Sequence, residues 1–297
     1  MLAPAAAAPG FWDWSLDPPL VLVVALAILY WVGDRRTVTP ERTRGAQRWR
    51  SACFYTALVA LAVALASPIE PLSEQLFWVH MIQHVLMLVV AAPLLVVARP
   101  WIRLWRSLPL DTRRWLARGL SQGRRTSPLR ALSRALGSAT AGFVAFSVVL
   151  LTWHLPFMFD ATLRSETLHA LEHTLFFSTA VMFWKHAIPS PPLHTPLVAA
   201  QRVVYAIGGM IVSWVLAVVL ALAPNPLYAF YAHEASRPGG ISALADQQLA
   251  AGIMWVPGSV TFLIVVFVYV HRWLTPSAPT DRPGSAGTRG TRLAGEH

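Results

Sequence analysis

Long apolar stretches, separated by polar or basic connections, dominate the pattern of the chain. Seven of them approach the roughly 20 residues that a helix needs to cross a bilayer. They predict helices over Pro19–Val32, Ser51–Ser67, Leu76–Ala98, Gly137–Leu155, Leu168–His186, Pro196–Leu222 and Gln247–His271. The predicted fold is therefore all-α, a polytopic membrane protein built as a seven-helix transmembrane bundle.

The connections between these stretches alternate in charge. Arginines crowd the first and third connections, whereas the second holds only Glu70 and Glu74 as charged residues. Positively charged loops stay on the cytoplasmic side of a membrane. The even-numbered connections are therefore expected outside, with the N-terminus outside and the C-terminus cytoplasmic, in a multi-pass protein of the cell (plasma) membrane.

The same pattern divides the chain into three parts. Residues 1–18 are expected to form an outer N-terminal tail, and residues 19–272 the transmembrane domain. Residues 1–20 contain no Lys or Arg. The basic N-terminal region of a signal peptide is therefore missing, and no cleavable signal peptide is expected. The basic connection 99–136 interleaves Trp and Leu with arginine, which favours amphipathic helices on the cytoplasmic leaflet over a solvated loop. Residues 273–297, rich in Pro, Gly, Thr and Ser, are expected to be a disordered cytoplasmic tail.

Composition narrows the class further. With 55% hydrophobic and 13% charged residues, the chain is too apolar for an ordinary soluble domain. The net charge of +10 comes almost wholly from arginine, since Lys185 is the only lysine. These arginines lie between apolar segments, so anionic lipid of the inner leaflet is the expected partner and nucleic acid is not. Cys53 is the only cysteine, which excludes an internal disulfide and any Cys-x-x-Cys motif.

Five histidines fall within the apolar stretches, and the predicted orientation places all five towards the outer face. They are His80, His84, His154, His169 and His173. Polar side chains inside a bilayer are costly and usually mark function. A single buried histidine is more often a hydrogen-bonding group than a ligand, but residues four apart share a helix face, so each of the two pairs could grip one ion. The histidines therefore predict a metal site open to the outer compartment.

Other polar and sulfur-containing residues accompany the histidines. Both pairs follow the form His-x-x-(Gln/Glu)-His, which sets an amide or carboxyl on the same helix face, where it could bind the ion or orient a ligand. An acid at the start of the last apolar stretch could be a helix cap or the charged partner of the histidines. Nearby thioethers, if they are more than packing residues, favour copper over zinc. These auxiliary candidates are Gln83, Glu172, Asp246, Gln247, Met81 and Met158.

Two other functions remain open at this point. His169 to His173 also matches the inverted zinc-protease pattern His-x-x-Glu-His, in which the glutamate is the general base, so an intramembrane zinc metalloprotease is one alternative. A b-type haem held by histidines from two helices is another. The pattern alone specifies neither a substrate groove nor a macrocycle site, and a protein that handles a metal ion is favoured over an enzyme.

Several motifs, taken in order, resemble the CtaG family of cytochrome c oxidase assembly factors, seven-helix membrane proteins associated with caa-type oxidase. The resemblance covers about residues 15–272. It rests on His80–His84 leading into Ala92–Leu95, Trp153–Pro156 with Asp160 and Ala161, His169–His173, Phe183 with Trp184, and Asp246–Gly252. The resemblance implies a role in maturing the oxidase, with oxidase subunits as partners and with delivery or insertion of copper as the expected step.

Overall fold

The computed structural model describes residues 18–122, 137–193, 195–234 and 237–275. Within these ranges every regular element is helical. In chain order the elements are α1 (Pro18–Arg35), η1 (Glu41–Thr43), α2 (Arg44–Ala66), α3 (Ile69–Ser73), α4 (Phe77–Val85), η2 (Leu86–Ala91), α5 (Ala92–Ala98), α6 (Trp101–Ser107), α7 (Leu110–Gln122), α9 (Ala139–Trp153), α10 (Pro156–Thr162), α11 (Glu166–Ala187), α12 (Ala199–Leu222), α13 (Ala229–Ala232), η4 (Pro238–Gly240) and α14 (Ala243–Leu274).

Five helical stretches of the described residues are long and apolar enough to cross a membrane: α1, η1 with α2, α4 through α5, α12 and α14. The bent pair of α9 and α10 makes a sixth if the two helices form one span. Helix α11 has 22 residues but is less apolar, because its first half carries His169, Glu172 and His173. The all-helical, multi-pass fold is thus confirmed, whereas the number seven and the orientation stay predictions.

Large apolar side chains on the outside of the bundle support this membrane assignment. Val204 on α12 is 71% exposed and Phe267 on α14 is 70% exposed, while twenty polar or charged side chains are buried. A soluble domain rarely exposes so many large apolar side chains, because removal of apolar surface from water stabilises its fold. The exposed face therefore suits lipid.

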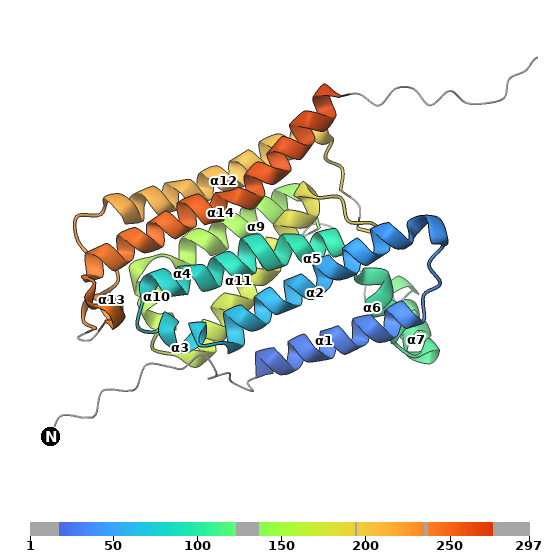
Figure 1. Cartoon of the computed structure of the whole chain (residues 1–297), viewed down its shortest axis with the longest axis horizontal. Helices are drawn as coiled ribbons and strands as arrows, with labels where there is room; N and C mark the ends of the chain where they lie inside the picture. The colour runs from blue at the N-terminus through green and yellow to red at the C-terminus, as the bar shows by residue number, and fades with distance from the viewer. Residues whose placement is uncertain (1–17, 123–136, 194, 235–236, 276–297) are drawn as a thin grey trace, which may run out of the picture.

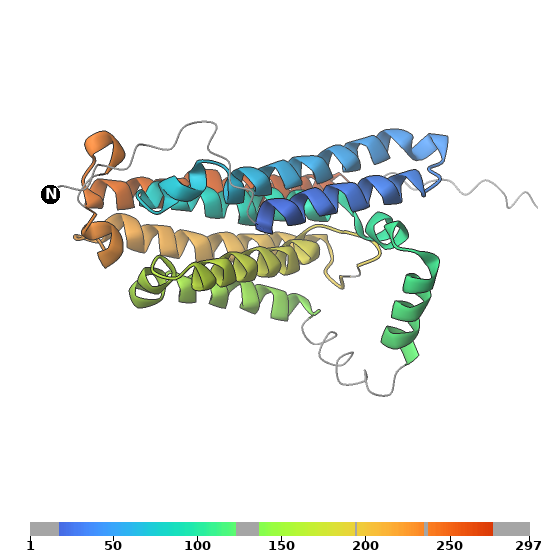
Figure 2. The same ribbon diagram turned by 90° about the horizontal axis from the view of Figure 1, so that it is seen from below.

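The long helices run side by side, and the short elements gather at the two ends of the bundle (Figures 1 and 2). Helices α3, α10 and α13 lie at one end, here called the α3 end, and α6 and α7 lie at the other, the α6 end. Acids prevail in the connections at the α3 end, and arginines prevail at the α6 end. This separation is the one that the alternating charge of the connections predicts.

The helix from Phe77 to Ala98 contains a π-helical turn, η2, just before Pro93. Proline has no amide hydrogen, so Pro93 can donate to neither of the carbonyls that lie one turn earlier, Leu88 and Val89. Side chains from two other helices replace the missing donor. Trp184 Nε1 donates to the Leu88 carbonyl at 2.7 Å, and Thr261 Oγ1 donates to the Val89 carbonyl at 2.5 Å.

A sharp bend of 80° separates α9 from α10. Pro156 is the cause, because the residue before a proline is driven out of the helical conformation. Leu155 accordingly adopts φ −66° and ψ 133°, and His154 becomes the C-cap of α9. The bend therefore places His154 at the edge of the bundle interior, beside the start of α11.

The basic connection predicted over residues 99–136 begins as two helices. Helix α6 packs against α1, where a Cβ on Gly33 would meet the Arg103 carbonyl oxygen at 1.9 Å. Arg103 is buried there and its Nε lies 2.5 Å from Asp34 Oδ1. Contact of α7 with the lipid surface stays a prediction. The rest of this connection, from residue 123, most of the N-terminal tail and most of the C-terminal tail lie outside the described residues.

Candidate metal centre

Two imidazoles at the start of α4 form the middle of the site. His80 and His84 are one helical turn apart, so their side chains leave the same face of the helix. Both are buried, at 0% and 5% exposure. Their Nε2 atoms lie 3.0 Å apart. The pair predicted from the spacing of four residues therefore meets at one point inside the bundle.

The other three histidines surround this pair. The ring centroids of His169 and His173 on α11 are 4.2 Å apart, and His169 lies 5.2 Å from His80. His173 lies 5.6 Å from His84, and His154 lies 6.0 Å from His84. Helices α4, α9 and α11 thus bring five imidazoles, spread over 94 positions of the sequence, into one cluster, here called the histidine cluster.

Glu172 supplies a carboxyl group to the same cluster. Its side chain is fully buried, and Oε1 lies 3.9 Å from His84 Nε2. One potential ligand atom each from His80, His84, Glu172 and His173 lie within 4.8 Å of one another. Among the described residues this is the group whose geometry could hold a metal ion. His154 and His169 flank it.

Hydrogen bonds to Nδ1, the ring nitrogen that points away from the centre of the cluster, fix the tautomers of two imidazoles. His80 Nδ1 lies 3.1 Å from the Tyr231 hydroxyl, which itself donates in a short bond to the Ser73 carbonyl. Burial raises the pKa of Tyr231 well above its ordinary value, so the phenol keeps its proton. With that proton directed to Ser73, Tyr231 can only accept from His80. His80 therefore carries hydrogen on Nδ1 and presents a lone pair on Nε2.

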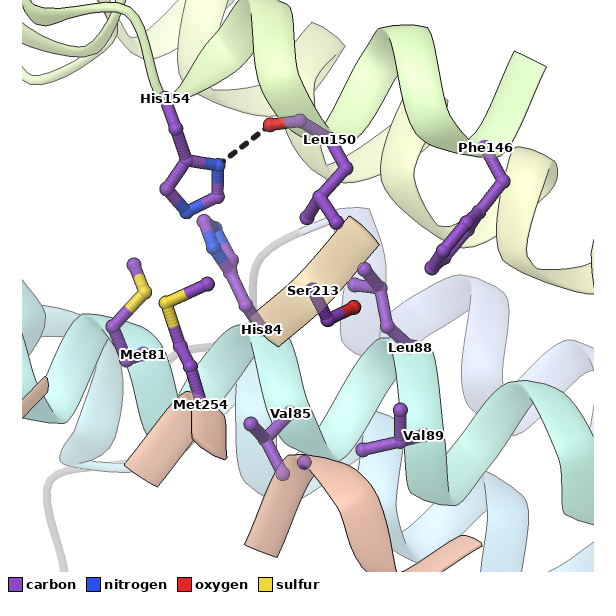
Figure 3. A pocket seen from close by; sticks show the side chains of 11 residues that line it. Met81, His84, Val85, Leu88, Val89, Phe146, Leu150, His154, Ser213 and Met254 are labelled. Carbon is purple, nitrogen blue, oxygen red and sulfur yellow. Dashed lines mark hydrogen bonds between the residues drawn. The ribbon is translucent and has the colours of Figure 1, made fainter. Parts of the chain in front are cut away.

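His154 is fixed in the same way. Its Nδ1 lies 2.8 Å from the Leu150 carbonyl oxygen, which can only accept (Figure 3). The hydrogen is therefore on Nδ1, and the lone pair is on Nε2. The backbone carbonyl of His154 in turn accepts from the Tyr228 hydroxyl at 3.0 Å, so the α12–α14 connection holds this residue as well.

Several buried polar atoms of the cluster have no hydrogen-bond partner of ordinary geometry among the described residues. Native proteins pair most such atoms, so a group of them in one place needs an explanation. A cation bound between the imidazoles and Glu172 would satisfy lone pairs on those of them that lie within reach of one ion. The atoms are Gln83 Oε1, His84 Nδ1, His154 Nε2, His169 Nε2, His173 Nε2 and both carboxyl oxygens of Glu172.

A small cavity of about 40 Å³ lies beside His84 and His154. Met81 and Met254 line it together with His84 (Figure 3). Leu88, Leu150 and Phe146 close the rest of its wall. The cavity is large enough for a water molecule or an ion, which needs roughly 10–15 Å³ by this measure. The thioether of Met158, on α10, is not part of this wall.

Gln83 connects the cluster to α2 and α3. Its Nε2 donates to the Ala64 carbonyl at 2.8 Å and, in a short bond, to Glu70 Oε2. The other oxygen of Glu70 lies 3.7 Å from His169 Nδ1. Gln83 thus positions a second carboxyl group near His169, at ion-pair distance and beyond hydrogen-bond distance.

The two polar residues of α14 are used differently. Asp246 accepts from the backbone amides of Phe77 and Trp78 at 3.0 and 2.9 Å. It thereby caps α4, the helix that carries the first histidine pair, while Ser242 caps α14 itself. Gln247 bonds to the Leu227 amide and the Leu220 carbonyl at 2.7 and 2.9 Å, which secures the end of α12. Neither side chain bonds to a histidine of the cluster.

Sequence reasoning missed four residues that contribute to the site: Glu70, Tyr228, Tyr231 and Met254. Tyr231 forms a hydrogen bond with His80 Nδ1, Glu70 lies 3.7 Å from His169 Nδ1, and Met254 borders the cavity. Each comes from a segment distant in the sequence from the histidine it serves. An acid between two apolar stretches was a signal for Glu70, but no local pattern distinguishes Tyr231 or Met254 from packing residues.

A bundle of membrane-length helices that buries a histidine and glutamate cluster defines a polytopic membrane protein with a candidate metal centre. The chain belongs to the cytochrome c oxidase caa3 assembly factor family (Caa3_CtaG), whose family model matches residues 24–275. No curated protein and no solved structure matches the chain. The protein is therefore a membrane-embedded factor for cytochrome c oxidase assembly, and membership of an assembly-factor family favours a non-enzymatic role.

Proposed function

We propose that the protein binds a copper ion in the histidine cluster and passes it to a cytochrome c oxidase subunit during assembly. The observation that carries the proposal is the group of buried, unpartnered nitrogen and oxygen atoms on His84, His154, Glu172 and His173. The family supplies the process, oxidase assembly. The chemistry of the cluster supports the step, because buried lone pairs need a cation or a hydrogen-bond donor, and several imidazoles with a carboxyl group form a typical metal-ligand set.

The spacing of the cluster suits one ion. Nitrogen ligands lie about 2.0–2.1 Å from Zn²⁺ and at similar distances from copper. Two nitrogens 3.0 Å apart, as in His80 and His84, would then subtend an angle of roughly 95° at the ion. Glu172 adds a carboxyl group, which would neutralise part of the charge that an ion brings into the apolar interior.

Copper is favoured over zinc by the sulfur atoms nearby. Imidazole ligands suit both metals, but thioether sulfur is a soft ligand that selects Cu(I). Met81 and Met254 line the cavity that adjoins His84 and His154. An ion that leaves the imidazoles would therefore find thioether ligands in the adjoining cavity, which is a useful property in a protein that must release its cargo.

The cluster lies at the α3 end, where the acidic connections gather (Figure 1). By the distribution of positive charge this end faces outwards. We therefore propose that copper enters from the outer side of the plasma membrane, and that the client is an oxidase subunit whose copper-binding part is accessible there. The arginine-rich connections would remain on the cytoplasmic side.

The two alternatives receive less support. A peptidase that uses Glu172 as its base needs room for a peptide, yet the carboxyl is fully buried, and the cavity that His84 lines measures only about 40 Å³. The same small volume disfavours a haem, since pockets for cofactors of that size usually measure roughly 300–1,000 Å³. Peptide cleavage lost in Glu172→Gln would favour the protease, and a Soret absorption band would favour the haem.

Metal content of the purified protein tests the proposal. After anaerobic reconstitution with Cu(I) and with Zn²⁺, and removal of excess metal, elemental mass spectrometry should find stoichiometric copper in the wild-type protein. His84→Ala and His173→Ala should lose it. His271→Ala, which removes an exposed histidine at the far end of α14, should retain it. Stoichiometric zinc without copper would overturn the copper assignment, and the absence of both metals would overturn the site.

A further inference from the structure

A second, larger cavity lies at the α6 end, far along the bundle from the histidine cluster. It is an open groove of about 790 Å³ bordered by α2, by the second half of the Phe77–Ala98 span and by α14. Its wall is mostly aliphatic and includes Val90, Leu94, Val97, Ile264 and Val268. These elements are membrane-length helices, so the groove lies at a depth where lipid chains are its natural neighbours.

Three arginines line the same groove: Arg50, Arg99 and Arg272. The ion pairs among the described residues join Arg44, Arg103 and Arg114 to acids, and none involves these three. Arg99 donates to the Pro189 carbonyl at 3.0 Å, a neutral partner. Burial and the neighbouring charge of Arg50 lower the pKa of Arg99. Three guanidinium groups that line one groove and form no ion pair with a carboxylate can bind an anion by charge-assisted hydrogen bonds.

The backbone at Arg99 adds a second observation. Arg99 has φ 51° and ψ 54°, the left-handed conformation, and among the described residues it is the one non-glycine with positive φ. This conformation costs an ordinary residue about 1–2 kcal/mol relative to glycine. Residues held under such strain often serve a function. Glycine would adopt this conformation with less strain, but arginine occupies the position and its guanidinium lines the groove.

We propose that this groove binds one anionic phospholipid from the leaflet at the α6 end. An acyl chain lies along the aliphatic wall, and the phosphate lies between Arg50, Arg99 and Arg272. A volume of about 790 Å³ falls within the range of cofactor-sized pockets and far exceeds the need of a free phosphate ion. The combination of an apolar trough with cations at its end matches a molecule that is apolar along its length and anionic at its head.

This site is independent of the metal centre. Its arginines lie at the α6 end, and although Val89 lines both this groove and the small cavity beside His84, no groove residue belongs to the histidine cluster. A lipid in the groove would contact α2, α5 and α14 together, at the end of the bundle where α14 has few neighbours (Figure 1). The lipid would thereby act on the stability of the bundle and not on ion binding.

Native mass spectrometry of the full chain in mild detergent tests the proposal. With phosphatidylglycerol the wild-type protein should retain one tightly bound lipid, and with phosphatidylcholine it should retain none. The triple variant Arg50→Gln, Arg99→Gln, Arg272→Gln should weaken phosphatidylglycerol binding by on the order of 100-fold, since each arginine near a charged headgroup contributes about a five- to tenfold factor. The triple variant Arg42→Gln, Arg48→Gln, Arg106→Gln removes the same charge from exposed positions outside the groove and should keep the bound lipid.

A second pair of variants separates the lipid from other occupants without a change of charge. Val97→Trp fills the aliphatic wall and should expel phosphatidylglycerol, whereas Val204→Trp, on the exposed face of α12, should not. Inorganic phosphate should fail to compete with the lipid. Equal lipid retention by both arginine variants would overturn the proposal. Competition by phosphate, or an apolar helix of another protein cross-linked at Val97 in place of lipid, would overturn it too.

Discussion

At the scale of single residues, the site depends on which nitrogen of each imidazole carries hydrogen. Tyr231 accepts from His80 Nδ1, and the Leu150 carbonyl accepts from His154 Nδ1, so both rings direct Nε2 lone pairs inwards. His84 differs. Its Nε2 lies 3.0 Å from His80 Nε2, and because His80 Nε2 has only a lone pair to offer, His84 Nε2 carries the hydrogen of this bond. Metal binding through this nitrogen requires the hydrogen to move to Nδ1, which frees the Nε2 lone pair for the ion.

The contact between Tyr231 and His80 gives a prediction. Tyr231→Phe removes the acceptor that fixes the His80 tautomer, so metal affinity should fall on the order of 10- to 100-fold, as losses of such orienting partners usually do. Competition between the protein and a copper chelator measures the change. Tyr228→Phe is the matched control, since that hydroxyl bonds the backbone of His154 and not a ring nitrogen. Equal losses in both variants would show that the effect is general destabilisation.

At the scale of helices, the sequence predicted what local spacing determines. Pairs of histidines four residues apart had to share a face, and an apolar helix with polar atoms on one face must direct that face inwards. Local spacing carries no information on contacts between distant segments. Tyr231, on the short helix α13, reaches His80 across 151 positions, and Asp246, in the first turn of α14, reaches Phe77 across 169. The π-helical turn before Pro93 escaped prediction because its stabilising donors, Trp184 and Thr261, also come from other helices.

Asp246 links two helices, and this link gives a second prediction. Its two oxygens accept from the Phe77 and Trp78 amides at the start of α4. Asp246→Asn keeps only one acceptor and removes the favourable charge at a helix N-terminus, so the free energy of unfolding should fall by about 1 kcal/mol. Thermal unfolding in detergent measures this. Copper affinity should stay unchanged, because Asp246 bonds to no imidazole of the cluster. A fall in affinity of tenfold or more at unchanged stability would instead make Asp246 part of the metal centre.

At the scale of the whole molecule, the two ends of the bundle differ in chemistry. The α3 end combines acidic connections with buried imidazoles, and the α6 end combines arginines with an apolar groove. The long helices between them are apolar on the outside, so neither end depends on the other for its local contacts. Substitutions at one end should therefore leave the activity of the other intact, which permits a test of function in cells.

That test is the third prediction. Loss of the protein should lower the amount of copper-replete oxidase while the transcripts of its subunits stay unchanged. His84→Ala and His173→Ala should reproduce the loss with the protein still present in the membrane, because each removes a potential ligand and little packing. Trp105→Ala, on the exposed side of α6, should have far less effect, since it lies at the opposite end of the bundle.

Added external copper should partly restore oxidase in the histidine variants, because mass action can replace a delivery step that has become weak. Oxidase activity is read together with copper content of the purified enzyme, so that poor assembly is distinguished from empty copper sites. Normal, copper-replete oxidase in both histidine variants under copper limitation would contradict delivery through the cluster. It would leave the imidazoles as a structural network, in which case the same variants should lower the stability of the protein without changing oxidase.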